Sequence, residues 1–324
     1  MTTSPPAGET NPTLADLGEF GLITRVTAGR AQPATTLLGP GDDAAVVAAP
    51  DGRVVVCTDS AVEGVHWRPD WSTPQQVGRK VVAANLADVA AMGAVPTALL
   101  AALSCPSATG VEQLAGYAEG MWTEAGTVGV GVVGGDVTSA AQVVITVTAL
   151  GSLEGRDPVT RAGARPGDLL AVRGRLGWAA AGLAVLSRGF RSPAAVVGAH
   201  RVPEPPYAAG PEAARAGATA MIDVSDGLLA DLGHVARASE VLVDVRSAAF
   251  EVPARIADVG RALGVDPLHW VLTGGEDHAL AATFPDPPPP GWTVVGHVRE
   301  GPAEVLVDGR VYDGGPEGWD HFRR

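Results

Sequence analysis

Short runs of β-branched residues alternate along the chain with segments whose apolar residues recur at helical spacing. The run at 53–58 (RVVVCT) predicts a buried strand. Thr73, Pro74 and Gln76 then form a capping-box pattern, which predicts a helix that ends near Gly93. The first half should contain further strands at 98–104, 127–133 and 143–150, and a second helix at 111–126 behind a capping box at 109–112.

The same alternation restarts after Gly151, so we expect the chain to divide near residue 152 into two α/β domains. Residues 192–211 predict a loop, and PDPPPP at 285–290 predicts a second loop or stiff linker, because proline fits neither a ladder nor a helix. The second half should contain strands at 168–173, 220–224, 241–245 and 279–284, and helices at 178–187 and 228–238. The expected divisions are a disordered tail at 1–13, an N-terminal domain at 14–152 and a C-terminal domain at 153–324.

Composition narrows the class of protein. Of the 324 residues, 46% are hydrophobic, which is enough for a sizeable core and excludes a disordered or fibrous chain. The net charge of −13 disfavours nucleic acid as a partner. An acidic surface also repels nucleotides unless metal cations reverse the local sign of the charge.

The distribution of apolar residues and cysteines predicts a cytoplasmic protein. The uncharged stretch at 89–111 is interrupted by glycine and proline, so we expect no membrane partner. Residues 1–12 lack the apolar core of a signal peptide. Cys57 and Cys105 form no CxxC pair, which favours free thiols in a reducing compartment.

Two glycine patterns resemble binding signals. Gly129, Gly131 and Gly134 match GxGxxG, but they fall inside a predicted strand that no helix follows, so a dinucleotide site is not expected. The turn at 174–177 precedes a predicted helix. Such a turn either binds an anion at the helix start or only reverses the chain.

Acidic residues recur at the ends of predicted elements, where a cap or a turn explains each one alone. Asp88 is harder to explain, because it lies among alanines and valines, where an unpaired carboxylate is costly. If the acids converge, two of them about 4 Å apart repel by roughly 4 kcal/mol at an effective dielectric of about 20. Bound cations would make the cluster tolerable, and oxygen ligands favour several Mg²⁺ or Mn²⁺ ions on a polyphosphate. The acids are Asp42, Asp43, Asp59, Asp88, Asp136, Asp223, Asp226, Glu276 and Asp277.

Longer strings cover nearly the whole chain. They are GEFGLI (18–23), GPGDDAAV (39–46), TDS…GVHW (58–67), NLADVAAMGA (85–94), GGD (134–136), TRAGARPGD (160–168), IDVSDGLLADLGH (222–234), LTGGEDH (272–278) and WDHF (319–322). With them the chain resembles the thiamine-monophosphate kinase family, in the superfamily of aminoimidazole ribonucleotide synthetase and selenophosphate synthetase. The resemblance implies an α/β (α+β) protein with a mixed-sheet N-terminal domain that dimerises and a C-terminal α/β domain that completes the cleft.

The resemblance also implies roles for individual residues. Mg²⁺ would be held by Asp43, Asp59, Asp88, Asp136, Asp223 and Asp226, with Cys57 and Thr58 contributing beside Asp59. ATP would contact Gly135, Asp136, Arg161 and Ser225, and thiamine monophosphate would contact His66, Glu276 and Trp319. Cys57 replaces a frequent serine, so only its backbone carbonyl suits a hard cation, and His278 replaces a common tyrosine.

The implied activity is ATP-dependent phosphorylation of thiamine monophosphate to thiamine diphosphate, in a homodimer. The acceptor is a phosphate monoester with a second pKa of about 6, so it needs no general base. Metal ions that neutralise and align two polyanions supply what this transfer requires. Two alternatives stay open: another ATP-dependent synthetase of the superfamily, and a non-catalytic sensor of nucleotides or thiamine phosphates.

Overall fold

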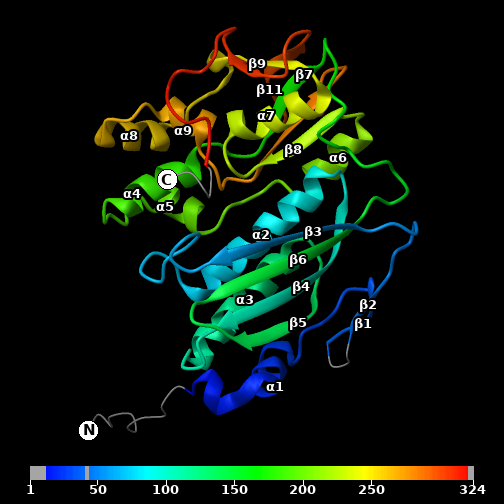
Figure 1. The fold of residues 1–324 in the computed structure, drawn as a ribbon, viewed down its shortest axis with the longest axis vertical. Helices are drawn as coiled ribbons and strands as arrows, with labels where there is room; N and C mark the ends of the chain where they lie inside the picture. Colours follow the sequence, from blue (N-terminus) through cyan, green and yellow to red (C-terminus); the bar gives the residue numbers. More distant parts are fainter. Residues whose placement is uncertain (1–11, 41–43, 320–324) are drawn as a thin grey trace.

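The computed structural model describes residues 12–40 and 44–319. Figure 1 shows two halves stacked along the long axis, each built around its own β-sheet. A four-stranded sheet belongs to the first half, and a six-stranded sheet belongs to the second. The mixed α/β class expected from the sequence is confirmed. The domain boundary near residue 152 stays a prediction, with the last strand of the first sheet ending at Ser152.

In the first half, helices cover one face of the sheet, and no described helix covers the other face, which is called the open face below. The strand order is β3-β6-β4-β5, and only β4 and β5 are parallel. Alternate residues of β6 are buried, from Ile145 to Ala149, because they face helices α2 and α3. The elements are α1 (Leu14–Thr27), β1 (Thr36–Leu38), β2 (Val46–Val47), β3 (Val55–Val62), α2 (Pro74–Ala91), β4 (Val95–Cys105), α3 (Val111–Thr127), β5 (Val132–Ser139) and β6 (Val144–Ser152).

Local signals predicted α2 well and α3 less well. The capping box of Thr73 and Gln76 is present at the start of α2. The box expected at 109–112 is wrong, because Gly110 is the N-cap of α3 and makes no side-chain capping bond. The strand expected at 127–133 is also wrong, since α3 continues through Thr127 and β5 begins only at Val132.

In the second half, the sheet order is β12-β9-β11-β7-β10-β8, and only the pair β12 and β9 is parallel. The four expected strands and two expected helices are present. The loop expected at 192–211 is wrong, because it contains two short helices. The elements are β7 (Leu169–Arg173), α4 (Trp178–Ser187), α5 (Ala194–Arg201), α6 (Ala209–Arg215), β8 (Ala220–Val224), α7 (Leu228–Ser239), β9 (Leu242–Val245), η1 (Ser247–Ala249), α8 (Ala254–Leu263), α9 (Pro267–Thr273), β10 (Ala279–Phe284), β11 (Thr293–Arg299) and β12 (Val305–Val307).

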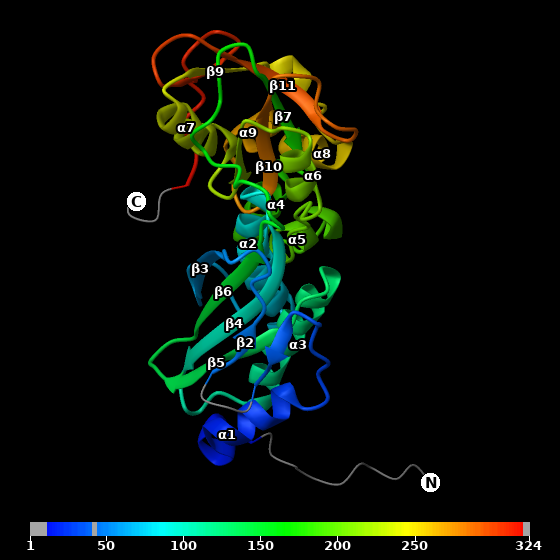
Figure 2. The same cartoon turned by 90° about the vertical axis from the view of Figure 1, so that its right-hand side faces the viewer.

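Helix α2 joins the two halves, as Figure 2 also shows. It packs on its own sheet and on α3, and its other side contacts β8, β10 and α6. Glu124 on α3 is buried and accepts hydrogen bonds from Arg79 Nε of α2 at 2.8 Å and from the Tyr207 hydroxyl of the second half at 2.8 Å. The functional groups carried by α2 therefore face both halves. Among the described helices, none has the length and apolar character to cross a membrane.

Candidate active site

Three of the predicted acids meet where α2 contacts both sheets. Asp59 lies within β3 rather than at its end, and its backbone N–H donates to Asn85 Oδ1 at 3.1 Å. Asp88 follows one turn later on α2, and Asp223 lies on β8 of the other half. Burial, together with the carboxylates of Asp223 and Asp59, raises the pKa of Asp88 to about 8. With all three carboxylates ionised, the cluster would therefore hold more negative charge than its surroundings compensate.

His278 gives part of that compensation. Its Nδ1 lies 3.1 Å from Oδ2 of Asp223, and both side chains are buried. Burial opposes a charged imidazole, but Asp223, Glu276 and Asp88 outweigh burial and raise the pKa of His278 above its ordinary value. His278 is therefore part of the charged site.

A second group of acids surrounds the turn between β8 and α7. The buried carboxylate of Asp231 accepts the backbone N–H groups of Asp226 and Gly227, each at 3.0 Å. Burial and the charges of Asp223 and Asp226 raise the pKa of Asp231 to about 7. The backbone N–H of Trp319 donates to the carbonyl of Asp226 at 3.0 Å, so the end of the described chain returns to this turn.

Lys80 and Glu276 form an ion pair between the halves. Lys80 Nζ lies 3.0 Å from Oε2 of Glu276 and donates to the carbonyl of His66 at 3.2 Å. His200 Nδ1 lies 3.3 Å from the same Oε2. Burial would raise the pKa of Glu276, but Lys80 and His200 outweigh it and lower the pKa to about 2. Burial and Lys80 lower the pKa of His200 to about 4, so its imidazole is neutral near pH 7.

Asp136 and Gly135 lie away from these groups. Asp59 and Gly135 occupy one row across the sheet, three strand spacings apart, which corresponds to about 14 Å. Asp136 is exposed and belongs to the open face, whereas Asp59 faces α2. Thr58 is also on the open face, and its hydroxyl donates to the Val147 carbonyl at 3.0 Å. One chain therefore does not bring all the predicted ligands together.

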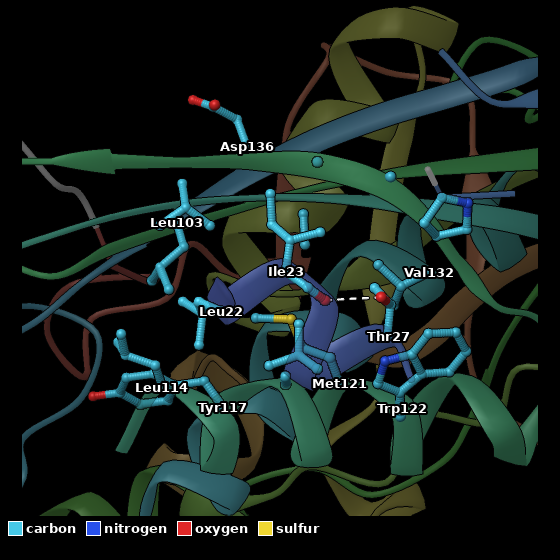
Figure 3. A pocket seen from close by; sticks show the side chains of 17 residues that line it. Leu22, Ile23, Thr27, Leu103, Leu114, Tyr117, Met121, Trp122, Val132 and Asp136 are labelled. Atoms are coloured by element: carbon cyan, nitrogen blue, oxygen red, sulfur yellow. Dashed lines mark hydrogen bonds between the residues drawn. The ribbon is translucent and has the colours of Figure 1, made fainter. Parts of the chain in front are cut away.

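An apolar cavity of about 110 Å³ lies beside Gly135, between α1, α3 and the edge of the sheet. Figure 3 shows that Leu22, Met121 and Trp122 face this cavity, while the Asp136 carboxylate points away from them. A Cβ at Gly135 would lie 1.8 Å from the Ala101 carbonyl oxygen, so only glycine fits at this point of β5.

The other predicted nucleotide contacts lie near the β8–α7 turn. Ser225 accepts the N–H of Glu276 at 2.7 Å through its carbonyl. Arg161 is exposed. It lies close enough to His234 of α7 that its charge, together with burial and the charge of Arg237, lowers the pKa of that histidine. Both residues therefore lie on the Asp226 side of the site.

Cys57 faces α2, and its thiol donates to the Asn85 carbonyl at 3.3 Å. Burial and the charges of Asp88 and Asp59 raise the pKa of this thiol, which keeps it neutral. A neutral thiol is a poor ligand for a hard cation. Asp42 and Asp43 lie outside the described residues.

The turn at 174–177 is occupied by the chain itself. Asp277 Oδ1 accepts the backbone N–H of Ala179 at 2.8 Å, in the first turn of α4. This carboxylate therefore takes the place of an external anion at the helix start. Lys80 and His200 act through contacts between distant segments, so no local sequence pattern identified them. Asp231 was also missed, although its contacts with Asp226 and Gly227 are local, and Asn85, one turn before Asp88, carried a local signal.

The donor set suits a hard divalent cation. Asp59, Asp88 and Asp223 offer carboxylate oxygens. The raised pKa of Asp88 reflects burial first and then repulsion by Asp223 and Asp59, and a bound cation would offset both. Within residues 12–40 and 44–319, no three acidic, histidine or cysteine side chains already enclose a metal position. Mg²⁺ usually binds one or two protein carboxylates together with substrate phosphates. A set of acids that does not enclose the ion by itself agrees with this mode of coordination.

The fold and the site define the class of protein. Residues 41–153 match the family described as AIR synthase related protein, N-terminal domain. The two-sheet architecture with acids between the sheets is therefore that of an AIR synthase-like protein.

Full-length relatives define the family within that class. The chain is 53% identical to "Thiamine-monophosphate kinase" of Mycobacterium tuberculosis (strain H37Rv) over 96% of this chain and 94% of the relative. The kinase structure from Stenotrophomonas maltophilia superimposes with a TM-score of 0.79 at 31% identity, over 90% and 96% of the two chains. "AaThiL complexed with AMPPCP and TMP" gives 0.78 at 30% identity, over 97% and 100%. The chain belongs to the thiamine-monophosphate kinase family.

Proposed function

We propose that the protein transfers the γ-phosphoryl group of ATP to thiamine monophosphate, giving thiamine diphosphate and ADP. The 53% identity over nearly the whole chain carries this proposal. AaThiL binds AMPPCP, an ATP analogue, together with TMP, which supports the same two substrates here. The free thiols Cys57 and Cys105 fit a reducing compartment, and we propose the cytoplasm as the place of action.

Asp59, Asp88 and Asp223 would hold Mg²⁺, and Asp226 would extend the site toward α7. When bound, Mg²⁺ neutralises the phosphate oxygens of donor and acceptor, which otherwise repel. The acceptor phosphate already carries its nucleophilic oxygen, so no side chain has to remove a proton. The chain's own residues therefore bind and orient the two substrates.

The apolar cavity beside Gly135 is our candidate for the adenine base. Its lining of Leu22, Met121 and Trp122 suits a flat aromatic ring, and the adjacent Asp136 belongs to the predicted nucleotide contacts. Arg161 lies near α7 in the other half, away from this cavity, and remains a separate candidate contact for ATP.

A substitution tests this cavity. Ala118→Phe places a ring inside the cavity, where it would displace the adenine base. Loss of apolar contacts in such a pocket weakens substrate binding by roughly 1–3 kcal/mol, so KM for ATP should rise about tenfold or more. KM for thiamine monophosphate should change less than about twofold. Steady-state kinetics with each substrate varied in turn measures both constants. An unchanged KM for ATP would place the base elsewhere.

Thiamine monophosphate would contact the other side of the site. Glu276 suits the thiazolium cation, and an indole face adds roughly 0.5–2 kcal/mol through a cation–π contact. Trp319 is mostly exposed and held by its backbone at Asp226, which leaves its ring at the surface of the site.

We further propose a homodimer through the open face of the first sheet. Val56 is 63% exposed there, beside the hydroxyl rows of β3 and β6, and the exposed Leu100 lies on β4, at the end of one of these rows. A second copy on this face would also bring another set of acids near Asp136. Val56→Asp should shift sedimentation equilibrium from dimer to monomer, whereas a wild-type protein that sediments only as a monomer would contradict the dimer.

The activity itself is tested by turnover. Purified full-length protein with ATP, Mg²⁺ and thiamine monophosphate should yield many equivalents of thiamine diphosphate, separated by chromatography. At most one equivalent per chain would indicate a sensor instead of an enzyme. No product from a folded protein would overturn the proposed function.

A further inference from the structure

Lys80 is the only lysine in the chain, which otherwise uses arginine for its basic groups. It lies on α2 at the junction of the halves and is 8% exposed. A buried ammonium without partners would be strongly destabilising, so its contacts define its role. None of the substrate or metal contacts proposed above uses it.

The ammonium group connects two segments that both carry proposed substrate contacts. One N–H donates to Glu276 Oε2 at 3.0 Å, and another donates to the carbonyl of His66 at 3.2 Å. The His66 ring is itself fixed, because its Nδ1 accepts the backbone N–H of Val62 at 2.9 Å. Lys80 thus fixes the position of the β3–α2 turn relative to Glu276.

The backbone of the segment that carries Glu276 is held against the β8–α7 turn. Glu276 has φ +65°, and its N–H donates to the Ser225 carbonyl at 2.7 Å. A Cβ at Gly275 would lie 2.3 Å from that same carbonyl oxygen, so the two backbone segments are in close contact there and only glycine fits. Only the long side chain of Glu276 can still change its conformation, and one third of it is exposed. The ion pair with Lys80 restricts that freedom.

We infer that Lys80 is a positioning residue for the thiamine substrate, holding the Glu276 carboxylate and the His66 turn at a fixed separation across the two halves. This inference rests on the proposed function, since it concerns the same substrate. The lowered pKa of Glu276 agrees with it, because the ammonium keeps the carboxylate charged. A compact ammonium suits two acceptors in different directions better than a planar guanidinium does.

Kinetics of three variants test the inference. Lys80→Met keeps the length and apolar stem of the side chain but removes the charge. KM for thiamine monophosphate should rise about tenfold or more, while KM for ATP changes less than about twofold, because binding of only one substrate is affected. The double variant Lys80→Met/Glu276→Gln should raise KM by less than the product of the two single effects, since Lys80 acts partly through Glu276 and partly through the His66 carbonyl. Arg261→Met, on the exposed side of α8, is the matched control and should leave both constants unchanged.

A spectroscopic measurement keeps the test independent of turnover. Full-length protein labelled with [ε-¹³C]lysine has one lysine signal, which must come from Lys80. Thiamine monophosphate alone, without ATP, should shift this signal in the wild type, and Glu276→Gln should abolish the response. Two results would overturn the inference while leaving the proposed function intact. One is a lysine signal that does not shift when thiamine monophosphate is added, and the other is an unchanged or lower KM for thiamine monophosphate in Lys80→Met. Absence of thiamine diphosphate formation by the wild type would overturn both.

Discussion

Asp88→Asn should lower turnover by about a thousandfold and raise the stability of the metal-free protein. Asp88 lies between Asp59 and Asp223, where a cation would share its charge with both phosphates. Loss of several kcal/mol of charge stabilisation in the transition state corresponds to this factor, at about 1.4 kcal/mol per tenfold change. Asparagine keeps the shape and removes the repulsion. Turnover close to that of the wild type at saturating Mg²⁺ would contradict a metal role for Asp88.

The stability effect has a defined pH dependence. The pKa of Asp88 rises from 3.8 in the unfolded chain to about 8 in the fold. Between these values the folded state retains a proton that the unfolded state has lost, so stability falls as pH rises from about 4 to about 8. Urea denaturation at several pH values without Mg²⁺ should show this fall in the wild type and a smaller fall in Asp88→Asn. Asp258→Asn, exposed on α8, is the control and should behave as the wild type.

Local patterns in the sequence predicted the elements that local interactions determine. Thr73 and Gln76 satisfy each other across one helical turn, so the start of α2 needed no knowledge of the rest of the chain. The strand at 220–224 was equally clear, since all of its residues are buried in the sheet. The acids were recognisable as a group, but their convergence depends on α2 packing against both sheets, which no spacing expresses.

The misplaced elements have physical reasons. Glycine and alternating valine at 127–134 suggested a strand, but packing of α3 extends that helix through Thr127. The prolines at 192–211 suggested a loop, although the alanine-rich stretches between them form α5 and α6. Tertiary packing decided both cases.

The separation of Asp136 from Asp59 has a consequence for how the site is completed. Opposite faces and about 14 Å of sheet divide them in one chain. A nucleotide that contacts Asp136 and the acids near α2 must therefore bridge an edge of the sheet or use two copies. The proposed homodimer through the open face allows the second arrangement.

Gly78→Ala should destabilise the fold by about 3 kcal/mol or more and abolish activity with it. Helices α2 and α3 cross at Gly78 and Gly120, and a Cβ at Gly78 would lie 2.0 Å from the Tyr117 carbonyl oxygen and 2.9 Å from the Met121 nitrogen. Both obstacles are backbone atoms, so the helices must separate, and overpacking of this kind typically costs about 1–3 kcal/mol, occasionally more.

The same helix carries Lys80, Asn85 and Asp88, so its displacement would move the site as well as weaken the core. Gly126→Ala is the matched control, because no atom lies within 4 Å of its Cβ position near the end of α3. It should be neutral or stabilise by about 0.5–1 kcal/mol, since alanine is the better helix former. Denaturant unfolding of both variants measures the difference. Equal stabilities for the two would show that the helices do not cross as closely as this packing requires.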